Sequence, residues 1–192
     1  MLRRLYDKTL ALAASPKAVP ALVGVSFAES SFFPLPPDLL LVPMVLSARQ
    51  RWVYLAAVCT IASVVGAMFG YAIGALLFYQ VAEPILAFYG YSEKFAAFTE
   101  WFTEYGAWIV FLAGVTPFPY KVITIASGAA GLSLPIFVVA SIVARGLRFF
   151  IVAGLLYLFG PPIRDFIENR LALVLGVVGA LGVAGFIAVK FL

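Results

Sequence analysis

The chain has 192 residues, of which 64% are hydrophobic and 11% are charged, and its mean hydropathy is +1.07. These values exclude a soluble globular domain, so the chain requires a bilayer, and its recurring apolar stretches predict one compact membrane domain over residues 1–192. The net charge of +4 does not indicate a nucleic-acid partner, because most basic residues lie beside apolar segments, where topology signals and lipid headgroup contacts are expected.

Histidine is absent from the sequence and Cys59 is the only cysteine. Disulfides, thiolate metal clusters and Ser-His or Cys-His catalytic arrangements are therefore excluded. We expect no metal, no cofactor and no enzymatic activity.

The first segment, residues 1–16, predicts an interfacial helix. Its apolar side chains recur at helical spacing, with charges on the other side: Leu2, Leu5, Tyr6, Leu10 and Ala13. A secretory signal peptide is the alternative, because Arg3, Arg4 and Lys8 precede a short apolar run.

The next apolar stretch, 19–48, is interrupted by prolines and acids. Within ESSFFPLPPDLLLVP these residues are Glu29, Pro34, Pro36, Pro37, Asp38 and Pro43. Proline lacks the amide donor and clashes with the preceding turn, so no continuous helix is expected. A leg over 19–33 rises about 22 Å at roughly 1.5 Å per residue, which is short of a hydrocarbon core of about 30 Å. We therefore predict a re-entrant hairpin.

Residues 52–78 predict a transmembrane helix, because the stretch exceeds the roughly 20 apolar residues that a crossing needs. Its glycines follow a four-residue spacing that favours close packing of another helix: Gly66, Gly70 and Gly74. Residues 82–105 interleave aromatic side chains with acids and predict short interfacial helices.

A second interrupted stretch, 106–131, contains GVTPFPYKVITIASG, with Pro117 and Pro119 followed by Lys121. The pattern Pro-x-Pro-x-charge of residues 34–38 is thus repeated 83 positions later, with the acid replaced by a base. We predict a second re-entrant hairpin at this position.

Further transmembrane helices are predicted over 136–159 and 171–192. The expected fold is an all-α polytopic membrane protein with two inverted repeats, each a re-entrant helical hairpin plus a transmembrane helix, and an additional C-terminal transmembrane helix. Paired broken segments in inverted halves are typical of the midplane site of a transporter. The alternative is a set of proline-kinked helices that span the membrane fully.

Basic residues are unevenly distributed between the two sides of this topology. With re-entrant hairpins, one side holds Arg3, Arg4, Lys8, Lys17, Arg49, Arg51, Arg164 and Arg170. The positive-inside rule places that side in the cytoplasm and predicts a multi-pass protein of the cell inner (plasma) membrane.

Five ionisable residues fall inside or at the edge of apolar segments and are the candidate substrate-binding and transport residues: Glu29, Asp38, Lys121, Arg145 and Arg148. A charge near the centre of a spanning helix costs about 2.5 to 3.5 kcal/mol on insertion scales, so each is a functional candidate. Arg145 and Arg148 lie on one helical face, and with Lys121 they suit a phosphate receptor. The alternative is salt bridges to the two acids that hold the repeats together, and both roles can apply at different stages.

The two acids suit a different role. In a low-dielectric cavity, gaining or losing a cationic partner can switch the protonation of a carboxylate. Glu29 or Asp38 is therefore a candidate for proton coupling, with a purely structural pairing as the alternative.

The segments ESSFFPLPPD, TPFPYKVITIASGAAG and ARGLRFF resemble motif regions of the DedA family, also called the SNARE-associated or VTT-domain family. In the first region, Glu29 and the Pro-Pro-Asp ending at Asp38 take the places of the family's glutamate and Pro-Gly-acid. In the second region, Thr116 stands where the first arginine of the family is expected, and Lys121 stands near the second. The third segment is similar to the YqaA-like branch.

This resemblance implies two inverted re-entrant hairpins and a role in moving lipids. DedA-like proteins are linked to returning undecaprenyl phosphate or phosphatidylethanolamine to the inner face, and VTT proteins to phospholipid scrambling. The leading hypothesis is a flippase- or scramblase-like transporter of an anionic phospholipid or polyprenyl phosphate. Its partners are membrane lipids and, under proton coupling, protons; a homo-oligomer is left open. The alternatives are a proton-coupled small-solute or cation transporter and a non-transporting membrane-organising protein.

Overall fold

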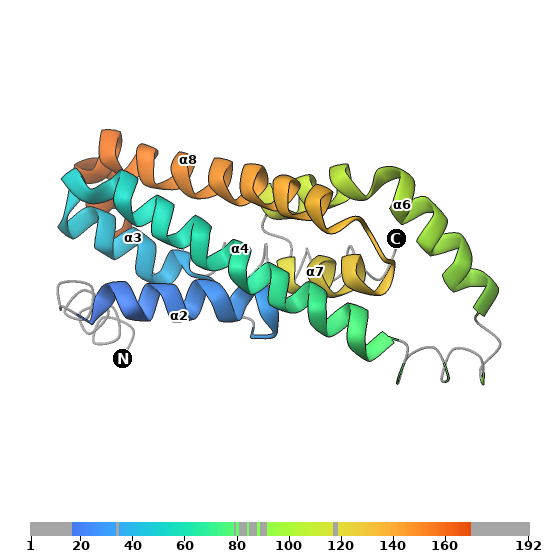
Figure 1. The fold of residues 1–192 in the computed structure, drawn as a ribbon. Helices are drawn as coiled ribbons and strands as arrows, with labels where there is room; N and C mark the ends of the chain where they lie inside the picture. Colours follow the sequence, from blue (N-terminus) through green and yellow to red (C-terminus); the bar gives the residue numbers. More distant parts are fainter. Residues whose placement is uncertain are drawn as a thin grey trace.

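A computed structural model describes residues 17–33, 35–78, 80, 84, 88, 92–116 and 119–169 (Figure 1). They form α2 (Ala18–Ser31), α3 (Asp38–Ser47), the 3-10 turn η1 (Arg49–Arg51), α4 (Trp52–Leu77), α6 (Ser92–Val115), α7 (Tyr120–Ala129) and α8 (Leu134–Asn169). Within these ranges the chain is helical and has no strand, as an all-α protein requires. The segments 1–16 and 171–192, with Pro34 and Pro117, lie outside the described residues.

Two helices are long and apolar enough to cross a bilayer, over Arg49–Leu77 and Leu134–Gly160. They confirm as helices the segments predicted at 52–78 and 136–159. The second one changes direction at Phe159, where φ is −112° and ψ is 16°. Two prolines follow Gly160 in the sequence, and because they lack amide donors the regular hydrogen-bond ladder cannot continue unchanged.

Three helices beside this pair are short. α2, α3 and α7 have 14, 10 and 10 residues, so at about 1.5 Å per residue they rise roughly 21, 15 and 15 Å. In Figure 1, α2 and α3 lie beside the N-terminal half of α4, whereas α7 lies beside its C-terminal half. The helical interruptions predicted from the prolines are present: α2 ends before Pro36 and Pro37, and Pro119 directly precedes α7.

The structure differs from the sequence prediction at the start of the second interrupted stretch. Interfacial helices were expected up to residue 105 and a new segment from Gly106, but α6 runs unbroken from Ser92 to Val115, across that boundary. No proline lies within α6, and a single glycine costs only about 1 kcal/mol in a helix interior, so nothing ends the helix there. A side chain at Gly106 would also press against Leu132, so the glycine permits close packing.

The glycines of α4 carry the closest helix contacts. A Cβ at Gly66 would overlap the backbone carbonyl of Phe27 in α2, and one at Gly74 would overlap the carbonyl of Ile125 in α7. The reciprocal contact holds for Gly128 of α7 against Tyr71 of α4. The glycine stripe read from the sequence is therefore a backbone-to-backbone packing surface, as small-residue stripes in membrane helices commonly are.

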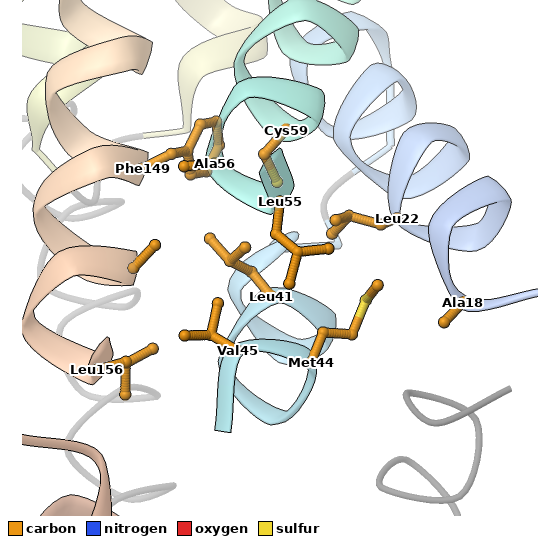
Figure 2. Close-up of a cluster of buried hydrophobic side chains, with 11 residues drawn as sticks. Ala18, Leu22, Leu41, Met44, Val45, Leu55, Ala56, Cys59, Phe149 and Leu156 are labelled. Carbon is orange, nitrogen blue, oxygen red and sulfur yellow. The ribbon is translucent and has the colours of Figure 1, made fainter. Parts of the chain in front are cut away.

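Two apolar clusters pack the molecule, one toward each end. The first joins α2, α3, the start of α4 and the end of the α8 span (Figure 2). It includes Leu22, Leu41, Val45, Leu55, Cys59 and Phe149. The second joins α6, α7, the rest of α4 and the start of α8, and it includes Ala67, Phe102, Val110, Tyr120, Leu132 and Phe137.

The outward faces of the long helices are apolar and open. Ile61, Leu76, Val139 and Leu158 are between 61% and 67% exposed. Water-soluble proteins rarely leave such large apolar surfaces uncovered. This exposure is what a helical membrane protein with lipid on these faces requires.

Candidate functional site

A layer of polar side chains lies between the two apolar clusters, midway along both span-length helices. Ser63 stands fourteen residues from either end of the 49–77 span, and Arg145 and Arg148 flank the middle of the 134–160 span. The two arginines are three residues apart, so they share one face of α8. Polar groups at this position are far from either end of the helices that carry them.

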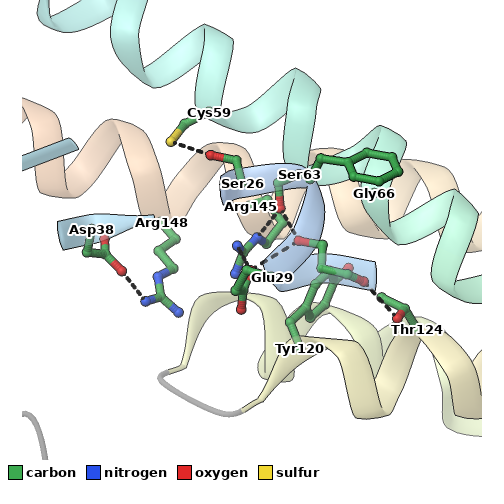
Figure 3. A network of polar contacts seen from close by, with 12 residues as sticks. Ser26, Glu29, Asp38, Cys59, Ser63, Gly66, Tyr120, Thr124, Arg145 and Arg148 are labelled. Atoms are coloured by element: carbon green, nitrogen blue, oxygen red, sulfur yellow. Dashed lines mark hydrogen bonds and ion pairs between the residues drawn. The ribbon is translucent and has the colours of Figure 1, made fainter. Parts of the chain in front are cut away.

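Arg145 is completely buried and forms the centre of this layer (Figure 3). Its Nη2 donates to Glu29 Oε2 at 2.5 Å, and its Nε donates to Ser63 Oγ at 2.6 Å. The guanidinium also lies over two rings, 4.9 Å from the centroid of Tyr120 and 4.7 Å from that of Phe149. Ion pairing, hydrogen bonds and cation–π contacts together offset the cost of burying this charge.

Hydroxyl groups extend the Arg145 contacts to neighbouring helices. A hydrogen bond of 2.6 Å joins Ser30 Oγ to Ser63 Oγ, and Ser30 Oγ also donates to Glu29 Oε2 at 3.1 Å. Thr124 Oγ1 of α7 donates to the carbonyl oxygen of Ser30 at 3.0 Å. The end of α2, the middle of α4 and the start of α7 therefore meet around a single arginine of α8.

Arg148 makes a second, more open ion pair. Its Nη2 donates to Asp38 Oδ2 at 2.7 Å, and its Nη1 donates to the carbonyl oxygen of Thr116 at 2.9 Å. The side chains of Arg148 and Asp38 remain 18% and 25% exposed. Asp38 is the first residue of α3 and Thr116 directly follows α6, so this arginine bonds both interrupted segments at once.

Some hydrogen-bonding capacity in this layer is unused. Within the described residues, Asp38 Oδ1 and Arg145 Nη1 are buried without a hydrogen-bond partner. Lys121 is partly exposed, and among the ion pairs of the described part it has none. The layer thus offers one free acceptor and unpaired cationic donors beside its two ion pairs.

The structure brings four of the five sequence-predicted residues into contact as two acid–arginine pairs: Glu29 with Arg145 and Asp38 with Arg148. Lys121 lies one residue after Tyr120, whose ring faces Arg145, but it joins neither pair. The hydroxyl partners were not predicted from the sequence. Their signal was weak, because single Ser and Thr residues in apolar helices usually bond to their own helix backbone. No group of metal-ligating side chains occurs in the part of the chain that the structure describes.

Most of the chain matches a known protein domain. The VTT domain matches residues 35–158, which run from just before α3 to near the end of the α8 span. The chain belongs to the VTT-domain family, also called the DedA family. The family predicted from the motifs is thereby confirmed, while the YqaA-like branch stays a prediction.

Relatives of this VTT-domain protein include an uncharacterized protein of Haemophilus influenzae, 41% identical over 153 residues that cover 79% of this chain and 78% of the relative. An uncharacterized HI0703 homolog of Histophilus somni is 32% identical over 151 residues, with the same coverage. No solved structure matches the chain. The VTT match includes Asp38, Lys121, Arg145 and Arg148, whereas Glu29 precedes it.

Proposed function

We propose that this VTT-domain protein carries an anionic phospholipid or polyprenyl phosphate across the inner membrane, and that it is not an enzyme. The observation that carries the proposal is the pair of acid–arginine bridges, because both arginines lie midway along the span-length part of α8. Ionisable groups at membrane depth are costly, and in membrane proteins they commonly mark pathways for substrates or protons. A protein that served only as an anchor would have little need of them.

The proposed topology has two re-entrant hairpins in inverted repeats, one made of α2 and α3 and the other of α6 and α7. The short rises of α2, α3 and α7 support it, since none reaches the roughly 30 Å of a hydrocarbon core. The remaining leg, α6, is longer and rises about 36 Å, but its N-terminal part carries the acids and aromatic rings expected at the interface. Reciprocal packing also supports it: α2 packs on α4 as α6 packs on α8, while α3 packs on α8 as α7 packs on α4. Such an exchange is typical of two units related by a pseudo-two-fold axis.

Within this proposal the arginines have separate roles. Arg145 is fully buried and paired, so it anchors the helices and does not meet the headgroup in this conformation. Arg148 and Lys121 are partly exposed and supply the positive charge for a phosphate. The acyl or prenyl tails stay in the bilayer, along the exposed apolar faces of α4 and α8.

Proton coupling is assigned to Asp38 in this mechanism. Protonation would neutralise its carboxylate and weaken the bridge to Arg148, which would free the arginine to bind an anionic headgroup. Loss of the proton would restore the bridge and release the headgroup. Glu29 remains the second candidate, but its bridge is buried more deeply.

The test is lipid movement in proteoliposomes made with the full chain and a fluorescent anionic phospholipid. Arg148→Gln should lower the flip rate at least roughly tenfold, because one charge-assisted phosphate contact is lost. Arg51→Gln is the matched control, since Arg51 is exposed and lies outside the polar layer. Equal rates in Arg148→Gln and the unmodified protein would disprove the mechanism, as would movement of a soluble ion without lipid.

A second candidate function is favoured by the full burial of Arg145, whose ion pair with Glu29 resembles a structural lock. In that case the protein organises the membrane without transport, and the charges only stabilise the fold. Joint replacement of Asp38 by Asn and Arg148 by Gln distinguishes the two functions, because it removes both charges and keeps polar groups in place. An organising protein would keep its cellular function in this variant, whereas a transporter would lose lipid movement.

A further inference from the structure

A basic groove lies at one end of the molecule, outside the polar layer. Its volume is about 360 Å³, and it is lined by Arg49, Gln50, Tyr157 and Leu158. η1 leads into α4 there, and α8 approaches its change of direction (Figure 1). One candidate span begins at Arg49 and the other ends at Gly160. The groove therefore lies where both helices reach the boundary of the apolar region.

Arg49 is held in position from several sides. Its Nη2 donates to the backbone carbonyl of Tyr157, and its Cζ lies 5.8 Å from the centroid of the same ring. Trp52 stacks on Tyr157 with centroids 5.6 Å apart. A Cβ at Gly160 would lie only 3.0 Å from Arg49 Nε, so glycine leaves room for the guanidinium. The arginine is therefore pre-organised and loses little side-chain freedom if it binds a ligand.

Among the described side chains, none forms an ion pair that neutralises the positive charge of Arg49. Neither Arg49 nor Arg51 takes part in an ion pair among the described residues, where the ion pairs are those of the polar layer. Arg49 Nε is buried and has no hydrogen-bond partner in the described part of the chain. A guanidinium has five N–H donors in a planar fork, and phosphate oxygens satisfy several of them together.

We propose that this groove binds the phosphate of an anionic lipid headgroup at the membrane boundary, as a site separate from the transported lipid. A lipid fits better than a free anion because Leu158 and Phe159 beside the groove are 65% and 53% exposed and would contact its acyl chains. Trp52 and Tyr157 are the residue types that lie at headgroup level in membrane proteins. The site does not depend on the proposed transport.

The test measures lipid binding to the full chain in detergent micelles by native mass spectrometry. The probes are phosphatidylglycerol, diacylglycerol with the same acyl chains, and inorganic phosphate. Arg49→Gln should weaken phosphatidylglycerol binding about tenfold. Arg51→Gln is the matched control and should change it less than about twofold, since Arg51 lies over the Tyr54 ring and does not line the groove.

Gln50→Glu provides a second variant in case Arg49→Gln does not fold. It adds a negative charge to the groove without removing the Arg49–Tyr157 hydrogen bond, and we expect about a tenfold loss of phosphatidylglycerol affinity. Unchanged affinity in Gln50→Glu, or equal losses in Arg49→Gln and Arg51→Gln, would overturn the site. If diacylglycerol bound as tightly as phosphatidylglycerol, the groove would not recognise the phosphate headgroup. If inorganic phosphate displaced phosphatidylglycerol, the ligand would be a free anion and not a lipid.

Discussion

Arg145 and Arg148 lie three residues apart on the same face of α8, yet their surroundings differ. The Arg145 side chain is 0% exposed and is enclosed by Glu29, Ser63 and two aromatic rings. The Arg148 side chain is 18% exposed and bonds one carboxylate and one backbone carbonyl. One charged helix face can thus combine a fixed anchor with a bridge that is open enough to exchange partners.

The largest expected effect on stability follows from removal of the buried Glu29–Arg145 bridge. Glu29→Ala leaves the buried Arg145 charge without its counter-ion, which should lower the free energy of unfolding by about 3–5 kcal/mol. Chemical denaturation in detergent, followed by circular dichroism, measures this change. Glu93→Ala is the control, because this glutamate is exposed in the first turn of α6 and its removal should have little effect. Equal stability of Glu29→Ala and the unmodified protein would mean that Arg145 is not an anchor.

A smaller loss of unfolding free energy is expected when Arg145 keeps its ion pair with Glu29 but loses the serine that accepts its second hydrogen bond. Ser63→Ala leaves Arg145 Nε without its acceptor and should cost about 1–3 kcal/mol of unfolding free energy. Ser26→Ala is the matched control, because that serine bonds only the weakly polar Cys59 Sγ among the described residues and should cost less than about 1 kcal/mol. The same denaturation measurement applies, and equal losses in both variants would show that the acceptor for Arg145 is unimportant.

Packing around the buried bridge gives a third test. Gly70→Ala would place a Cβ against Thr124 Oγ1 and the Ser30 carbonyl, and we expect a cost of about 1–3 kcal/mol from overpacking. Gly146→Ala on α8 is the control, because its nearest neighbour would be Thr60 Cγ2 at an ordinary 3.7 Å. Thermal unfolding should separate these two variants. A stabilised Gly70→Ala protein would contradict the close approach of α2, α4 and α7.

The smallest expected effect on stability follows from removal of the partly exposed bridge between Asp38 and Arg148. Asp38→Ala should lower the unfolding free energy by only about 1 kcal/mol, because the pair is partly exposed and Arg148 keeps the Thr116 carbonyl as an acceptor. The lipid flip rate should nevertheless fall, and its dependence on a pH gradient should disappear. A stability loss as large as that of Glu29→Ala would remove the distinction between anchor and exchangeable bridge.

Much of the helical pattern could be predicted from the sequence, for identifiable reasons. Long apolar runs have few alternatives to a spanning helix, and proline pairs without amide donors must interrupt one. The start of α6 was harder to predict, because its alternating acids and aromatic rings fit an interfacial helix as well as the beginning of a longer one.

The sequence predicted which charged residues form the candidate site, but not which acid bonds to which arginine. The cost of burying a charge singled out five residues, and the structure pairs all of them except Lys121: Glu29, Asp38, Lys121, Arg145 and Arg148. Which acid meets which arginine depends on how α2 and α3 are placed against α8, and sequence spacing does not encode that placement. The exposure of Lys121 and the burial of Arg145 follow from the same three-dimensional placement.

The glycines mark the closest approaches between helices. α2, α4 and α7 touch through backbone at Gly66, Gly74 and Gly128, while α6 meets α8 closely where a Cβ at Gly114 would press on Ala144. Between α4 and α8, by contrast, a Cβ at Gly146 would meet only a side-chain methyl at ordinary van der Waals distance. Arg145 of α8 bonds to Ser63 of α4 and Glu29 of α2, so any displacement of α8 against α2 and α4 must stretch or exchange these bonds.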